Sequence, residues 1–168
     1  KSKTECLFCP APPAAYTDPS TYDGADLSDI DMGNGKSIQV TFRYPSPGTT
    51  ISGDSSCEHD INRRISLANA SVAKMNKKVK GSKYVPWSTQ VAIYETITLP
   101  IVLYGCKYWT VSQGSLDKLE AFNNRACRKI NNCNLWRMRE YKITSTSLLQ
   151  RVGMQTMTSY LARLQLSW

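Results

Sequence analysis

The fold is decided by the stretch Phe42-Arg-Tyr-Pro-Ser-Pro-Gly-Thr-Thr-Ile-Ser52, which is followed closely by Glu58-His-Asp-Ile-Asn-Arg-Arg-Ile-Ser-Leu-Ala68. The first part contains two prolines and a glycine, which favour turns. The second part begins an apolar repeat at steps of three and four residues, which is typical of an amphipathic helix. We therefore expect the chain to change from extended structure to helices at this junction.

The charge of the chain changes sign near the same place. The whole chain has 168 residues and a formal net charge of +8. Residues 1–60 contain four basic and nine acidic residues, whereas residues 61–168 contain 17 basic and four acidic residues. A strongly basic segment favours polyanionic partners, nucleic acid first and an anionic membrane surface second. The alternative interpretation is an ordinary solvated surface.

Short strands and loops are expected in residues 1–56. Cys6-Leu-Phe-Cys9 is long enough for one strand, which the prolines that follow would end. Residues 14–37 carry five Asp and several glycines and are interpreted as an acidic loop. Residues 37–44 alternate apolar and polar side chains, which predicts a half-buried strand, and residues 49–52 suit a short return strand.

Helices are expected throughout residues 57–168. The hydrophobic periodicity predicts helices near 57–79, 88–105, 115–131, 145–152 and 156–168. Ser115 is expected to cap the third helix, and Pro100 is expected to kink the second. The predicted class is mainly α with a small β-hairpin, in which an extended first segment precedes a bundle of four to five helices. The predicted core residues are Ile61, Ile65, Val72, Met75, Ile97, Ile101, Leu119, Phe122 and Ile130.

Basic residues lie on the helix faces opposite these apolar stripes. We expect them to contact nucleic-acid backbone, and the candidates are Arg63, Arg64, Lys74, Lys77, Lys78, Arg125, Arg128 and Lys129. Exposed aromatic rings could add base stacking. However, aromatic residues at helical spacing beside Val, Ile and Leu are interpreted as core, and these are Trp87, Tyr94, Tyr104, Tyr108, Trp109 and Trp136.

Few residues suggest a metal site or catalysis. Cys6 and Cys9 have zinc-knuckle spacing, and Cys57 and His59 could supply two more ligands, but one such pair without a second favours unpaired thiols. No nucleophile elbow, phosphate-binding loop or metalloprotease motif is present in the sequence. The sequence predicts no cofactor and no small-molecule substrate. The longest apolar run, 91–106, is shorter than the roughly 20 residues that a membrane span needs.

Several of these segments, in this order, resemble the reverse transcriptases of non-LTR (LINE-type) retrotransposons. Phe42-Arg-Tyr followed by Gly48-Thr-Thr-Ile-Ser is similar to the primer-grip hairpin of that family, and Asp60 to Ala68 is similar to the helix after it. Leu99-Pro-Ile-Val-Leu-Tyr-Gly-Cys-Lys-Tyr-Trp109 and the helix Leu116 to Ile130 resemble later family segments. Leu148-Leu-Gln-Arg-Val-Gly153 and Arg163-Leu-Gln-Leu-Ser-Trp168 resemble its closing helices.

The resemblance implies a place for each segment within such an enzyme. Residues 1–56 would hold the end of the palm and a primer grip, with Phe42, Arg43, Tyr44 and Gly48 as the grip residues. Residues 57–168 would be the thumb, which holds a template–primer duplex. The catalytic aspartates of the family would precede Lys1, so we expect no polymerase activity from this chain alone.

Two departures from the family pattern indicate a decayed or repurposed copy, and the missing catalytic half and the long acidic loop favour a second hypothesis. Pro45-Ser-Pro47 stands where the family has a single Leu, and Lys107 stands where Glu is usual. The chain could instead be a recruited structural subunit of a larger protein assembly, organellar or membrane-associated. The first hypothesis implies a nuclear or cytoplasmic protein.

Overall fold

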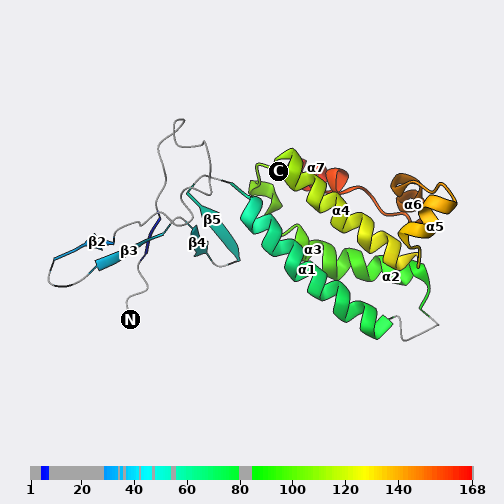
Figure 1. Cartoon of the computed structure of the whole chain (residues 1–168), viewed down its shortest axis with the longest axis horizontal. Helices are drawn as coiled ribbons and strands as arrows, with labels where there is room; N and C mark the ends of the chain where they lie inside the picture. The colour runs from blue at the N-terminus through cyan, green and yellow to red at the C-terminus, as the bar shows by residue number, and fades with distance from the viewer. Residues whose placement is uncertain are drawn as a thin grey trace. The chain divides into compact units, whose positions relative to one another are not determined.

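The computed structural model describes residues 5–7, 29–33, 35, 37–41, 43–46, 48–53, 56–79 and 85–167, and of these the side chains of 6, 45 and 76–79 lie outside the description. The chain divides into two compact units, Lys1–Asp60 and Ile61–Trp168 (Figure 1). The described part is mainly helical, with small strand pairs in the first unit. The predicted fold class, helices after an extended start, is therefore confirmed.

The first unit contains two small sheets. Strand β3 (Ser37–Thr41) pairs in parallel with β1 (Glu5–Leu7) and antiparallel with β2 (Ile30–Asp31). Strand β2 lies in the segment predicted to be loop throughout, so that prediction was wrong at these residues. The strand is only two residues long, too short for periodicity to detect.

The predicted strand over residues 37–44 is divided in two. Strand β3 ends at Thr41 and β4 (Arg43–Ser46) begins two residues later. The Thr41 hydroxyl donates to the Arg43 carbonyl at 2.8 Å and accepts from the Arg43 amide at 3.3 Å. These local bonds compete with a continuous strand ladder.

Strand β4 forms the expected hairpin with β5 (Thr49–Ser52), in which Ser46 lies opposite Thr49. Gly48 in the turn has φ of +91°, a conformation that favours glycine. The Thr49 hydroxyl donates to Asp60 Oδ2 at 3.1 Å, and Asp60 is buried. This bond connects the hairpin to the first turn of the helix that follows.

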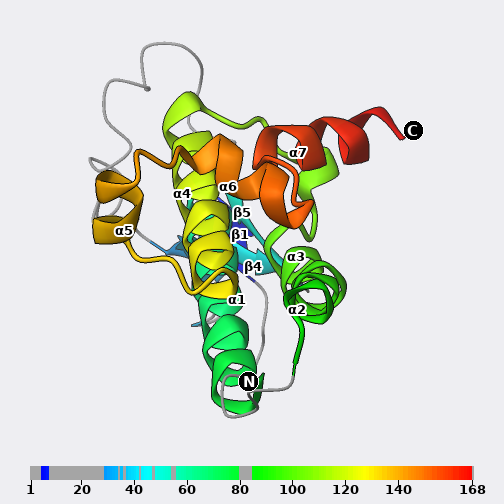
Figure 2. The same ribbon diagram turned by 90° about the vertical axis from the view of Figure 1, so that its right-hand side faces the viewer.

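The second unit is a helical bundle (Figures 1 and 2). Its helices are α1 (Glu58–Val79), α2 (Trp87–Ile93), α3 (Leu99–Val102), α4 (Gln113–Ile130), α5 (Leu135–Glu140), α6 (Ser145–Val152) and α7 (Met157–Leu166). A π-helical turn, η2 (Tyr94–Thr98), joins α2 to α3, and a 3-10 turn, η3 (Cys106–Tyr108), follows. Helix α4 contacts α2, α6 and α7, so it is the centre of the bundle.

Two helix predictions need correction. Helix α4 is capped by Ser112, whose hydroxyl accepts from the Ser115 amide at 3.3 Å, so Ser115 lies inside the helix and is buried. Either serine could cap a helix by composition, and only the backbone path decides between them. Helix α5 was not predicted, because six residues are too few to show a periodic apolar stripe.

The core prediction holds best on α4. Leu119, Phe122 and Ile130 are buried there, and Ile61 and Val72 are buried on α1. Ile65, Met75 and Ile101 are only half-buried, and Ile97 is 54% exposed. For these four residues the prediction of a buried side chain was wrong.

The π-helical turn explains the exposure of Ile97. Leu99 donates its amide to the Tyr94 carbonyl, five residues earlier, so this turn contains more residues than an α-helical turn. Tyr94 and Thr98 are both fully buried. Ile97, three residues after Tyr94, therefore points away from the core. The turn directly precedes Pro100, where the sequence predicted a kink.

Helices α4 to α7 are joined by three similar corners. At each corner a left-handed residue ends one helix: Asn132 (φ +49°), Lys142 (φ +49°) and Gly153 (φ +76°). The next amide in each case donates back to a carbonyl five residues earlier, as in a Schellman motif, at 2.9, 2.9 and 3.0 Å. Asn134, Thr144 and Thr156 then cap the following helices. These short corners fold the chain back on α4.

Among the described helices, none combines the length and apolar character that crossing a membrane requires.

Candidate nucleic-acid interface

The last turns of α4 present three of the predicted cations together. Arg125, Arg128 and Lys129 are separated by three and four positions, so they share one face of the helix. Arg125 and Lys129 are exposed and Arg128 is half-buried. The face of the helix that packs into the bundle buries residues such as Leu119, Ala126 and Ile130. The amphipathic pattern of α4 therefore turns these cations outward.

The corner between α4 and α5 adds Arg137, which the sequence did not suggest, and Trp136, which was expected in the core. The left-handed Asn132 turns the chain, and the Asn134 side chain accepts from the Arg137 amide at 2.9 Å to start α5. Helix α5 is anchored by Met138, which is buried. This places Trp136 and Arg137 beside the end of α4.

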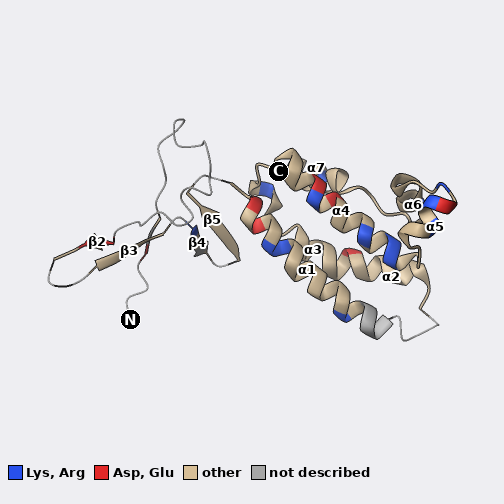
Figure 3. Ribbon diagram, in the orientation of Figure 1, with Lys and Arg blue, Asp and Glu red and all other residues tan. Residues whose placement is uncertain are grey.

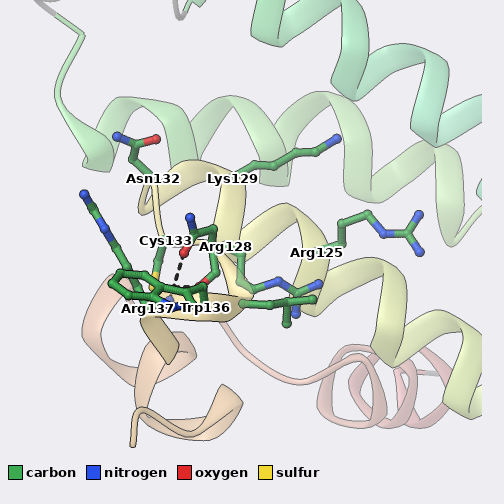
Figure 4. A pocket seen from close by; sticks show the side chains of 9 residues that line it. Arg125, Arg128, Lys129, Asn132, Cys133, Trp136 and Arg137 are labelled. Carbon is green, nitrogen blue, oxygen red and sulfur yellow. Dashed lines mark hydrogen bonds between the residues drawn. The ribbon is translucent and has the colours of Figure 1, made fainter. Parts of the chain in front are cut away.

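Together these residues line one open concavity of about 650 Å³, which we call the basic concavity (Figure 4). It is lined by Arg125, Arg128, Lys129, Asn132, Cys133, Asn134, Leu135, Trp136 and Arg137. In Figure 4 the Trp136 ring lies next to Arg137, and the long side chains of Lys129 and Arg125 extend from α4. The Trp136 side chain is 65% exposed and Leu135 is also exposed.

The electrostatic character of the basic concavity is uniform. Four cations line it, and none of its described lining residues is acidic. The cations of α4 also lie near the helix C-terminus, where the partial negative charge of the carbonyls stabilises them. Figure 3 shows blue cationic residues on the end of α4 that adjoins α5. A multivalent anion would find several cations within reach.

The side chains that line the basic concavity are mainly hydrogen-bond donors and an exposed indole. Burial raises the pKa of the nearby Cys127 thiol to about 11, so this thiol remains protonated at neutral pH. Of the described residues that line the concavity, none is His, Asp or Glu, the usual general bases. Guanidinium, ammonium and amide donors next to an exposed indole suit phosphate and a planar ring.

Side-chain hydrogen bonds connect α4 and α7 to other segments of the bundle. The Asn123 amide donates to the Gln155 carbonyl at 2.9 Å, which connects α4 to the residues before α7. The Tyr160 hydroxyl donates to Glu95 Oε1 at 2.6 Å, connecting α7 to the π-helical turn. Glu120 accepts from the Thr158 amide and hydroxyl, each at 3.0 Å, at the start of α7. The sequence did not suggest these pairs, because their partners are far apart in the chain.

The predicted cations of α1 do not all share one role. Arg63 and Lys74 are exposed, as expected for surface contacts. Arg64 is buried, and its guanidinium carbon lies 4.3 Å from the centre of the Tyr104 ring. The structure therefore does not place Arg64 on an exposed surface. Lys77 and Lys78 have side chains outside the described residues.

The residues expected to form a primer grip belong to the first unit. Arg43 and Tyr44 are half-buried in β4, and Gly48 forms the exposed hairpin turn. Phe42 lies outside the described residues.

Of the four suggested zinc ligands, the structure describes the side chains of Cys57 and His59. Cys57 is half-buried and His59 is exposed just before and at the start of α1. The side chains of Cys6 and Cys9 lie outside the described residues. Within the described part of the chain, no three or more His, Cys, Asp or Glu side chains form a metal-binding group.

The aromatic residues divide into two groups. Tyr94 and Trp109 are buried, in agreement with the core interpretation. That interpretation was wrong for four exposed rings: Trp87, Tyr104, Tyr108 and Trp136. For Trp136, the polar residue Asn134 shortly before it and the cations Arg137 and Arg139 after it are the signal that could have indicated a surface position.

Comparison of the chain with known protein families, with curated proteins and with solved structures finds no match.

Proposed function

We propose that the helical unit binds the sugar-phosphate backbone of nucleic acid through the basic concavity and acts as a non-catalytic module derived from a reverse transcriptase. The observation that carries this proposal is the joining of Arg125, Arg128 and Lys129 with Arg137 around one concavity. The descent rests on the sequence resemblance to LINE-type enzymes described above.

The surrounding charge supports the same function. Residues 61–168 carry 17 basic and four acidic residues. The formal net charge of this segment is therefore +13. Such a surface binds polyanions by releasing condensed counterions, with little dependence on base sequence.

The test measures binding to a labelled duplex by fluorescence anisotropy at several salt concentrations. Each phosphate contact contributes about 0.9 to the slope of log K against log salt for duplex DNA. Replacing Arg125, Arg128 and Lys129 with Gln keeps helix propensity and removes three charges. We expect the slope to fall by up to about 3 and affinity to fall at every salt concentration.

Arg139→Gln is the matched control, because Arg139 is exposed on α5 but does not line the basic concavity. This variant should retain nearly all of the affinity and slope of the wild-type chain. Binding that does not respond to salt, or the same loss from Arg139→Gln as from the triple variant, would contradict the proposal.

A second candidate function is attachment to a partner protein as a structural subunit. One observation favours it: an open groove of about 640 Å³, which we call the apolar groove, lies between α1 and the α2–α3 segment. It is lined by Leu67, Ala70, Ser71, Lys74, Met75, Ile93, Ile97 and Ile101. Leu67 and Ile97 are large exposed apolar side chains. Exposed apolar surface of this kind marks contacts with other proteins.

The variant Ile97→Glu distinguishes attachment to a partner protein from nucleic-acid binding. A subunit function requires co-purification with a protein partner at fixed stoichiometry after nuclease treatment. That association should be lost in Ile97→Glu and kept in the triple Gln variant. The reverse result, with association dependent on the basic concavity and sensitive to nuclease, favours nucleic-acid binding.

A further inference from the structure

The exposed indole of Trp136 gives the basic concavity a second recognition element besides charge. Trp136 is the second residue of α5 and is 65% exposed, whereas Met138 anchors that helix in the core. The fold of α5 therefore does not require burial of the indole. A large apolar ring kept in solvent next to four cations is suited to a ligand that is both aromatic and anionic.

We propose that the basic concavity selects single-stranded nucleic acid, with an unpaired base stacked on Trp136 while the adjacent phosphates contact the cations. This inference rests on the proposed function and specifies its substrate class. In a duplex each base face is covered by its neighbours, so an indole has no ring to stack on. In a single strand every base offers an aromatic face, whatever its identity.

The layout of the lining residues fits such a ligand. Arg125 and Lys129 are one helical turn apart, a rise of about 6 Å along α4. This spacing suits neighbouring phosphates of a nucleic-acid backbone better than a single point charge. Arg137 comes from the other side of the corner and lies next to the indole (Figure 4). Asn132 and Asn134 add polar side chains to the rim. An acidic peptide would satisfy the cations but leave the indole without a stacking partner.

The experiment compares a short single-stranded oligo(dT) with a blunt duplex of the same length at one salt concentration. We expect the single strand to bind on the order of ten-fold more tightly and to quench tryptophan fluorescence. Trp136→Ala should remove that preference and most of the quenching, with a larger loss of affinity for the single strand than for the duplex. Trp87→Ala is the matched control, since Trp87 is also exposed but does not line the basic concavity.

Several results would overturn the inference. Equal affinity of the wild-type chain for both oligonucleotides would do so without any variant, and would leave the proposed backbone binding intact. Retention of the single-strand preference in Trp136→Ala would also contradict it. Displacement of oligo(dT) by an equally charged polyglutamate, with the same quenching, would assign the site to an acidic protein segment. If neither oligonucleotide binds at low salt, the proposed function fails as well.

The variant Trp136→Phe distinguishes a loss of base stacking from a folding defect. The variant keeps an aromatic ring, so it should retain a smaller single-strand preference than the wild-type chain. Circular dichroism should show the same helix content in all three tryptophan variants. If Trp136→Phe is folded and binds the duplex as tightly as it binds the single strand, base stacking at this position is contradicted.

Discussion

The Tyr94 hydroxyl donates a hydrogen bond to Asn123 Oδ1 at 2.9 Å, and both side chains are completely buried. The Tyr94 ring also packs against Phe122, with 6.5 Å between the ring centres. This pair connects the π-helical turn to the middle of α4. The same Asn123 donates to Gln155, so one side chain connects three segments of the bundle.

Tyr94→Phe should destabilise the helical unit by about 1–3 kcal/mol. The change removes only the hydroxyl, but it leaves Asn123 Oδ1 buried without its donor. Chemical denaturation, monitored by circular dichroism, measures the decrease in the free energy of unfolding. Tyr141→Phe, at an exposed position, should change the free energy of unfolding by less than about 0.5 kcal/mol. Equal stability of Tyr94→Phe and the wild-type chain would contradict a structural role for this bond.

The stability of the unit should fall as the pH rises from 10 towards 12. Burial, and the hydrogen bond to Glu95, raise the pKa of Tyr160 from 10.0 to about 12. Burial also raises the pKa of Tyr94 well above its usual value. In this range the unfolded chain releases phenolic protons that the folded chain keeps. The free energy of unfolding therefore decreases as the pH rises.

Tyr160→Phe tests this pH dependence. Denaturation at a series of pH values should show a shallower decline for Tyr160→Phe than for the wild-type chain. Tyr141→Phe should show the wild-type decline. An unchanged decline in Tyr160→Phe would mean that Tyr160 titrates normally in the folded state.

Arg64→Ala should destabilise the unit more than Arg63→Ala, although the two arginines are adjacent. Arg64 is buried with its guanidinium over the Tyr104 ring, and Arg63 is exposed. The expected loss for Arg64→Ala is about 1–2 kcal/mol from packing and the cation–π contact, against less than about 0.5 kcal/mol for Arg63→Ala. A double-mutant cycle with Tyr104→Leu should give a coupling of about 0.5–1 kcal/mol.

Arg63→Ala, in contrast, should affect nucleic-acid affinity more than stability if α1 contributes to backbone binding. The same anisotropy titration used for α4 measures this effect. A larger effect of Arg64→Ala than of Arg63→Ala on affinity, at equal stability, would place the guanidinium of Arg64 at the surface.

Lys142→Gly should stabilise the corner between α5 and α6. Lys142 has φ of +49°, a left-handed conformation that costs a non-glycine residue roughly 1 kcal/mol. Part of the gain is offset by the greater freedom of glycine in the unfolded chain, so we expect an increase of about 0.5 kcal/mol. Thermal denaturation should show a higher Tm.

Gly153→Ala is the reverse substitution at the corner between α6 and α7, and it serves as the control for the backbone strain at Lys142. Gly153 has φ of +76°, and no neighbouring atom would contact an added Cβ within 4 Å. The expected loss of about 1 kcal/mol therefore comes from the backbone conformation alone. If Lys142→Gly lowers the Tm, a contact of the lysine side chain outweighs its backbone strain.

The amino-acid sequence determined the helical architecture, because apolar periodicity depends only on local spacing. The stripe through Ile61 and Val72 predicted α1, and residues 145–152 were predicted at the bounds that α6 has. The stripe on α4 likewise directed Arg125, Arg128 and Lys129 away from the core. These features need no knowledge of distant residues.

The tertiary structure alone decided which predicted cations lie together and which aromatic rings remain in solvent. The left-handed corner at Asn132 turns α5 back beside α4, and this turn brings Arg137 and Trp136 to the cations. The π-helical turn rotates Ile97 out of the core. The guanidinium of Arg64 lies over the Tyr104 ring. Each outcome depends on a change of chain direction or helix phase. Helical periodicity, which assumes a constant rotation per residue, does not contain that information.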